Sequence, residues 1–184
     1  MYRNCVTEIS VQHQKQVEEA LLELMQKLPY EDITVTQLCQ TANLSRRVFY
    51  HLFNSKAGAL HALLDHTILN MESWHPEIRD DALRFFLYWK SQVSLLDALR
   101  DNQMTGLLLE RMLESVMNES YDLRSWLKRN GWSREKDIII FHLSGIMGLV
   151  FRWYYSGFQE SPEEMATLIR KIMTVPLAQN PAKK

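Results

Sequence analysis

The sequence TVTQLCQTANLSRRVFYHLF, residues 34–53, is the most informative part of the N-terminal region. Thr34 and Gln37 have the spacing of a capping box, and the apolar residues that follow recur at helical spacing. Asn43 tolerates the left-handed conformation that a tight turn needs. Ser45 is a strong N-cap for a second helix. The stretch therefore predicts two short helices joined by a tight turn.

The second of these helices keeps basic, polar and aromatic side chains on its outer face once its apolar residues are buried. In a helix-turn-helix, that face enters the major groove of DNA. Arginine can donate two hydrogen bonds to guanine or pair with a phosphate, while hydroxyls and lysines are typical phosphate contacts. The predicted DNA-binding residues are Thr34, Thr36, Ser45, Arg46, Arg47, Tyr50, His51 and Lys56. The alternative interpretation is that they are ordinary solvated side chains of a helical hairpin.

Residues 11–60 resemble the N-terminal region of the TetR family of bacterial transcription regulators. The resemblance consists of an amphipathic first helix that ends near Leu28, the run ITVTQLCQTANLS, and FYHLF followed by Lys56 and Leu60. It implies an all-helical homodimer whose two heads bind successive major grooves of a near-palindromic operator. The C-terminal half also resembles a branch of the family found in Gram-positive bacteria.

Two positions of the motif depart from the pattern of the family. Many members carry Gly where this chain has Asn43, and Thr where it has Val48. Asn43 preserves the turn, whereas Val48 lacks a hydroxyl that could contact a phosphate.

The expected fold class is all-α. It combines an N-terminal three-helix DNA-binding head, which contains the helix-turn-helix, with a C-terminal helical bundle that dimerises. The expected divisions are a head at 1–54, a linking helix at 55–74 and a regulatory and dimerisation domain at 75–184. The boundary near His75-Pro76 follows because the residue before proline is pushed out of helical geometry.

Capping residues and apolar spacing predict nine helices, the first with Val11, Val17, Leu21, Leu24 and Leu28 turned inward. The helices are expected at 10–28, 34–42, 45–53, 55–72, 80–90, 93–100, 104–129, 134–156 and 161–174. Ser161, Pro162 and Glu164 form an especially strong start for the last one.

The last two helices are the expected dimer surface. The segment 138–155 is apolar nearly all round, so it must be covered on more than one side. The predicted interface residues are Ile138, Phe141, Gly145, Gly148, Arg152, Met165, Leu168 and Ile172. The alternative is that both helices complete the core of the monomer.

The C-terminal domain is also the place to expect a small-molecule pocket, because apolar walls with a few polar groups suit a ligand cavity. The candidate lining residues are Phe86, Trp89, Met112, Trp126, His142, Met147 and Phe151. The alternative is that aromatic and methionine residues at helical spacing are plain core.

Composition narrows the possible functions. The chain has 184 residues, of which 46% are hydrophobic and 23% charged, as in a globular protein with a proper core. The formal net charge is −1, so no global basic field attracts DNA, and binding would rest on local, salt-sensitive contacts. A head that no longer binds DNA is therefore one alternative.

Enzymatic and metal-binding motifs are missing from the sequence. It contains no glycine-rich phosphate loop, no GxSxG, and no CxxC or HExxH spacing, so we expect no catalytic residues, no metal and no cofactor. The two cysteines make no disulfide framework, and the polar N-terminus does not resemble a signal peptide. The longest apolar run, 138–151, is too short for a bilayer, so a cytoplasmic protein is expected.

The predicted function is a transcription repressor that occupies an operator as a homodimer and that a small-molecule effector could release. The alternative is a TetR-like activator or coactivator whose C-terminal domain binds a protein partner instead of a small ligand.

Overall fold

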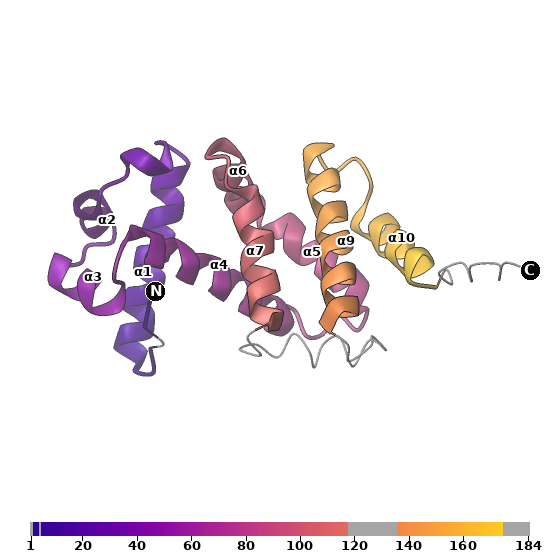
Figure 1. Ribbon diagram of the computed structural model, residues 1–184, viewed down its shortest axis with the longest axis horizontal. Helices are drawn as coiled ribbons and strands as arrows, with labels where there is room; N and C mark the ends of the chain where they lie inside the picture. Colours follow the sequence, from indigo (N-terminus) through magenta and orange to yellow (C-terminus); the bar gives the residue numbers. More distant parts are fainter. Residues whose placement is uncertain (1, 4, 118–135, 175–184) are drawn as a thin grey trace, which may run out of the picture.

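The computed structural model of the chain describes residues 2–3, 5–117 and 136–174. These residues form helices and, in the described ranges, no β-strand, which confirms the all-α prediction. The elements are α1 (Glu8–Met25), the 3₁₀ turn η1 (Tyr30–Asp32), α2 (Val35–Thr41), α3 (Arg46–Leu52), α4 (Lys56–Ser73), α5 (Asp81–Ser91), α6 (Val93–Asp101), α7 (Thr105–Met117), α9 (Lys136–Tyr155) and α10 (Pro162–Thr174). Helices α1 to α3 lie at one end of the molecule and α9 and α10 at the other, with α4 between them (Figure 1).

Side-chain caps set the starts of α2, α3 and α4, as the sequence predicted. Thr34 accepts a hydrogen bond from the Gln37 amide while the Gln37 side chain accepts one from the Thr34 amide, which completes the capping box of α2. The Ser45 and Ser55 hydroxyls each accept one hydrogen bond, from the amides of Val48 and Gly58, and so cap α3 and α4. Each such cap satisfies an amide that has no partner within its helix, typically worth about 1 kcal/mol.

Helix α1 differs from its prediction at both ends. It begins at Glu8 with Thr7 as its N-cap, and it ends at Met25, short of the expected end at Leu28. Val17 and Leu21 are fully buried, but Val11 is 50% and Leu28 36% exposed, so the prediction that these two face inward is wrong. Leu28 is exposed because it lies beyond the last helical turn, and Val11 lines a surface groove between α1 and α4.

Helix α4 joins the two ends of the molecule because it packs on α1 and also on α7. The Asp65 carboxylate on α4 is 2% exposed and accepts two hydrogen bonds from the Arg111 guanidinium on α7, at 2.9 and 2.6 Å. A second link comes from Asn102, after α6, which donates to the Met25 carbonyl and accepts from the Tyr30 amide. The orientation of the head is therefore tied to helices of the C-terminal half.

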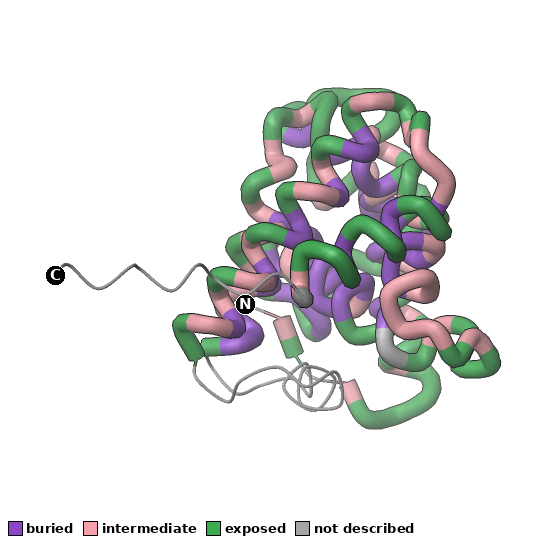
Figure 2. The backbone as a smooth tube through the Cα atoms, turned by 90° about the vertical axis from the view of Figure 1, so that its right-hand side faces the viewer, coloured by how far each residue is buried: buried purple, intermediate pink, exposed green. Residues whose placement is uncertain are grey.

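The C-terminal half encloses an aromatic core. Trp89 on α5 and Trp153 on α9 are fully buried, and the ring of Phe86 meets that of Trp153 edge to face, with centroids 5.6 Å apart. Buried residues gather between the helices and exposed ones on their outer sides (Figure 2). By length and composition α9 could cross a membrane, but residues along one side of it, from Ile139 to Tyr154, are buried against this core.

Parts of three predictions lie outside the described residues. The expected helix 104–129 is seen as α7 up to Met117, and the expected start of the helix 134–156 precedes the first described residue of α9. Trp126, a candidate ligand-binding residue, also lies outside the described residues, between α7 and α9.

Candidate nucleic-acid interface

Helices α2 and α3 have the geometry of a helix-turn-helix. Asn43, between them, has a φ of 52°, the left-handed conformation predicted for the turn. The Leu44 amide donates to the Cys39 carbonyl at 2.9 Å, which closes the end of α2. Phe49 and Leu52 are buried, and they turn the opposite side of α3 toward solvent.

The structure brings four predicted DNA-binding residues together on that solvent side of α3. Arg46, Arg47, Tyr50 and His51 are all exposed. The Arg46 guanidinium lies over the Tyr50 ring, 5.9 Å from its centroid, so the two side chains form one ridge. Arg47 and His51, again four residues apart, form the next ridge.

The predicted hydroxyl contacts flank α2 and the turn. Thr36, Ser45 and Arg46 line one groove of about 420 Å³. The hydroxyls of Thr34 and Ser45 also cap α2 and α3, so they already accept backbone hydrogen bonds. Either hydroxyl would therefore have to contact a phosphate while it also caps its helix.

Lys56 has internal partners. Its Nζ donates to the carbonyls of Tyr30 and Glu31, the latter at 3.2 Å, and lies 4.2 Å from the centroid of the Tyr30 ring. It therefore fastens the turn before α2 to the start of α4. Burial, with the charge of Glu31 adding to it, raises the pKa of Tyr30 to about 12, so the ring beside Lys56 is neutral at physiological pH.

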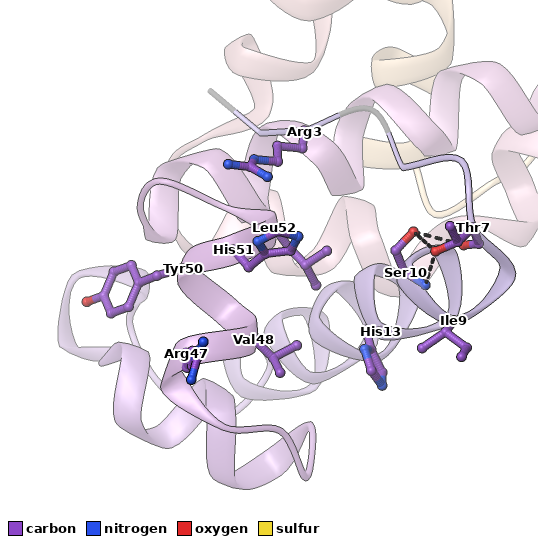
Figure 3. Close-up of a pocket in the computed structure, with 10 residues that line it drawn as sticks. All are labelled: Arg3, Thr7, Ile9, Ser10, His13, Arg47, Val48, Tyr50, His51 and Leu52. Atoms are coloured by element: carbon purple, nitrogen blue, oxygen red, sulfur yellow. Dashed lines mark hydrogen bonds between the residues drawn. The ribbon is translucent and has the colours of Figure 1, made fainter.

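A second groove along α3 contains residues that the sequence did not single out. It has a volume of about 570 Å³, and its arginine and histidine lining residues are Arg3, His13, Arg47 and His51 (Figure 3). No carboxylate is among the described residues that line it. Arg3 and His13 were missed because they come from the segment before α1 and from α1 itself, and only tertiary packing brings them to α3.

Many of the acidic residues of the head are engaged elsewhere. Glu18 is 6% exposed and bonded to His66 on α4 at 2.7 Å. Glu19 and Glu23 pair with Lys15 and Lys27 along α1. None of these three acidic residues lines the groove beside α3.

Cys39 lies under the motif helices and is 4% exposed. Burial raises the pKa of its thiol, while the Arg46 guanidinium acts in the opposite direction. A buried, protonated thiol is a small apolar core group.

The candidate ligand-binding residues occupy the core of the C-terminal half. Phe86, Trp89, Met112 and Met147 are fully buried, Phe151 and His142 are partly buried, and Trp126 lies outside the described residues. His142 Nδ1 is 2.8 Å from the Ile138 carbonyl of its own helix. The Trp89 indole N–H is buried and finds no hydrogen-bond acceptor among the residues that the structure describes.

The candidate dimer residues divide between surface and core. Phe141 is 66% exposed, Ile172 47% and Leu168 37%, and Gly145, Gly148 and Arg152 are exposed beside them. Ile138 is half-buried, and Met165, on the inner side of α10, is 1% exposed. An apolar surface thus remains on α9 and α10, at the end of the molecule far from α3 (Figure 1).

Residues 90–175 match the family model TetR_C_8, described as a transcriptional regulator C-terminal region. No curated protein matches the chain significantly. In the ranges that the structure describes, no three potential metal ligands cluster.

Proposed function

The chain belongs to the TetR family of transcription regulators, and from this we propose that it binds a specific DNA operator through α2 and α3. The observation that carries the proposal is the outer face of α3. Arg46 and Arg47 are exposed there, and neither forms an ion pair within the described ranges. Guanidinium groups held on a short helix by a buried opposite face suit insertion into a major groove.

We propose a homodimer as the binding unit. The supporting feature is the exposed surface of Phe141, Leu168 and Ile172, with Gly145 and Gly148 allowing another helix to approach. A symmetric pair of such surfaces would bury α9 and α10 against their copies and place two heads on one duplex. Because α4 connects each head to the rest of its protomer, its tilt would set the distance between the heads.

Control by occlusion is the proposed mechanism: the dimer sits on an operator that overlaps a promoter and represses transcription in the cytoplasm. An effector would act through its different affinities for the DNA-bound and free arrangements. The buried Trp89 N–H, which has no acceptor within the described ranges, supports an effector site, because a buried donor without an acceptor costs about 1–3 kcal/mol. The alternative, a coactivator with a protein partner, is supported by the surface on α9 and α10 if that surface does not dimerise.

Selection of bound duplexes from a random DNA pool tests the proposal. The full chain is expected to enrich a near-palindrome with half-sites about one helical turn apart. The matched control is the double variant Arg46→Ala/Arg47→Ala, which keeps Phe49 and Leu52 and should therefore fold. Equal enrichment by the wild type and the double variant, or no enrichment by the wild type, would refute DNA recognition by α3.

A further inference from the structure

The segment before α1 crosses the end of α3 (Figure 3). Tyr2 pairs with Phe53 in an antiparallel bridge, and the Arg3 amide donates to the Leu52 carbonyl at 3.0 Å. The last carbonyls of a helix have no partner within it, so this hydrogen bond satisfies one of the carbonyls that α3 leaves open. The segment, which we call the N-terminal arm, is thereby fixed to the proposed recognition helix.

Two buried side chains hold the arm from its other side. Gln14 on α1 is 3% exposed, and its side-chain amide donates to the Arg3 carbonyl at 3.0 Å. The Tyr2 hydroxyl donates to the Asp65 carboxylate on α4 at 2.9 Å. Both backbone polar groups of Arg3 are therefore bonded within the protein, and the position of its Cα is defined by α1 and α3.

The side chain of Arg3 is left exposed at the groove beside α3. It projects from the arm on the side of α3 that carries His51 and Tyr50 (Figure 3). Within the described residues it has no ion-pair partner, and the groove that it lines with Arg47 contains no carboxylate. Local positive charge is concentrated there although the chain as a whole carries −1.

We propose that Arg3 binds a backbone phosphate of the DNA on which α3 docks, and that Gln14 is the residue that positions it. The inference rests on the proposed DNA binding and adds a contact from outside the helix-turn-helix. A guanidinium presents parallel N–H donors that fit a phosphate, and duplex DNA offers one negative charge about every 1.7 Å along its axis. The arm thus offers a cation beside the helix that would read the bases.

The salt dependence of binding tests the contact. Dissociation constants are measured for the selected duplex and an unrelated duplex over a range of NaCl concentrations, with wild type and Arg3→Ala. The variant should bind both duplexes roughly tenfold more weakly, and the slope of log K against log salt should fall by about one per head. Lys15→Ala is the control. Lys15 is exposed on α1 and lines a different groove, so its removal should leave the salt slope unchanged.

A double-mutant cycle tests the role of Gln14. Gln14→Leu should weaken DNA binding about as much as Arg3→Ala. The double variant should bind little more weakly than either single variant, because both substitutions remove the same contact between Arg3 and the phosphate. Thermal unfolding of each variant checks that the fold persists; Arg3→Ala should leave the melting temperature unchanged, since only an exposed side chain is lost.

Three outcomes would overturn the phosphate contact: an unchanged salt slope in Arg3→Ala, a loss confined to the selected duplex, or full additivity with Gln14→Leu. Each of these leaves DNA binding by the wild type intact, so it is distinct from failure of the proposed function. If the wild type binds no duplex, both proposals fall together.

Discussion

Arg46 and Arg47 differ in their surroundings although they are neighbours in the chain. Arg46 stacks over Tyr50, whereas Arg47 faces the groove shared with Arg3 and His51. Replacing either arginine with Ala should weaken binding to the selected duplex by about 1–3 kcal/mol if it makes a bidentate base contact. Fluorescence anisotropy with the selected and an unrelated duplex measures both the loss and its sequence dependence. An equal loss on both duplexes would reassign that arginine to the phosphates.

Tyr50 can be compared with the two arginines, because its hydroxyl is proposed to contact a phosphate and not a base. Tyr50→Phe should weaken binding to both duplexes alike. Lys56→Ala is a poorer test of DNA contact, since Lys56 also holds the carbonyls of Tyr30 and Glu31 and its loss should lower stability.

His66 makes the stability of the head depend on pH. Its hydrogen bond to Glu18 raises its pKa above 6.5 against the opposing effect of burial, and the charges of Glu18 and Asp65 add to the rise. The protonated form is thus favoured in the folded protein. Its stabilising contribution is complete below the unfolded pKa of about 6.5 and is lost as pH rises through the higher folded pKa.

The excess stability of the wild type over His66→Gln, measured by urea unfolding, should therefore shrink over the pH range above about 6.5. The wild type must be compared with the variant because His61, on the same helix, makes a contribution to stability that changes with pH in the opposite direction. Burial and the charge of Arg111 lower the pKa of His61. A difference that stays constant over this range would show that the His66–Glu18 bond is absent in solution.

At the scale of the element, the turn between α2 and α3 depends on one backbone conformation. Asn43 has a φ of 52°, which costs an ordinary residue about 1–2 kcal/mol and a β-branched residue more. Asn43→Val should lower the free energy of unfolding by at least that amount, while Asn43→Gly should change it little. Gln40→Val is the matched control, because Gln40 is exposed within α2 and has helical geometry. Chemical denaturation of the three variants measures the differences.

The starts of α2, α3 and α10 were predictable from sequence, whereas both ends of α1 and the tertiary partners were not. Thr34, Ser45 and Ser161 act within three residues of their own amides, so local spacing revealed each cap. The end of α1 at Met25 coincides with a carbonyl bonded to Asn102, far away in sequence. Arg3 likewise reaches the candidate interface through contacts with Leu52 and Gln14 that no local pattern encodes.

At the scale of the whole molecule, the exposed surface on α9 and α10 predicts the oligomeric state. Phe141→Glu should convert the proposed dimer into a monomer, because a charge would be desolvated at the centre of a helix–helix contact. Sedimentation velocity at micromolar concentration measures the change. Leu69→Glu is the control, since Leu69 is an apolar residue of α4, 42% exposed and far from α10 in sequence. A wild type that sediments as a monomer would refute the proposed interface.

Because α4 packs against both the head and the C-terminal half, it limits how heads could be exchanged between related proteins. A chimera joined just before α4 would pair a foreign α1 with the native Asp65, His66 and Asn102, all of which bond to the first 30 residues of the chain. Such a hybrid would lose its hydrogen-bond partners at three points at once. To give this regulator a new operator specificity, only the outer residues of α3 should be replaced. The hydrogen bonds between the head and the C-terminal half would then be kept.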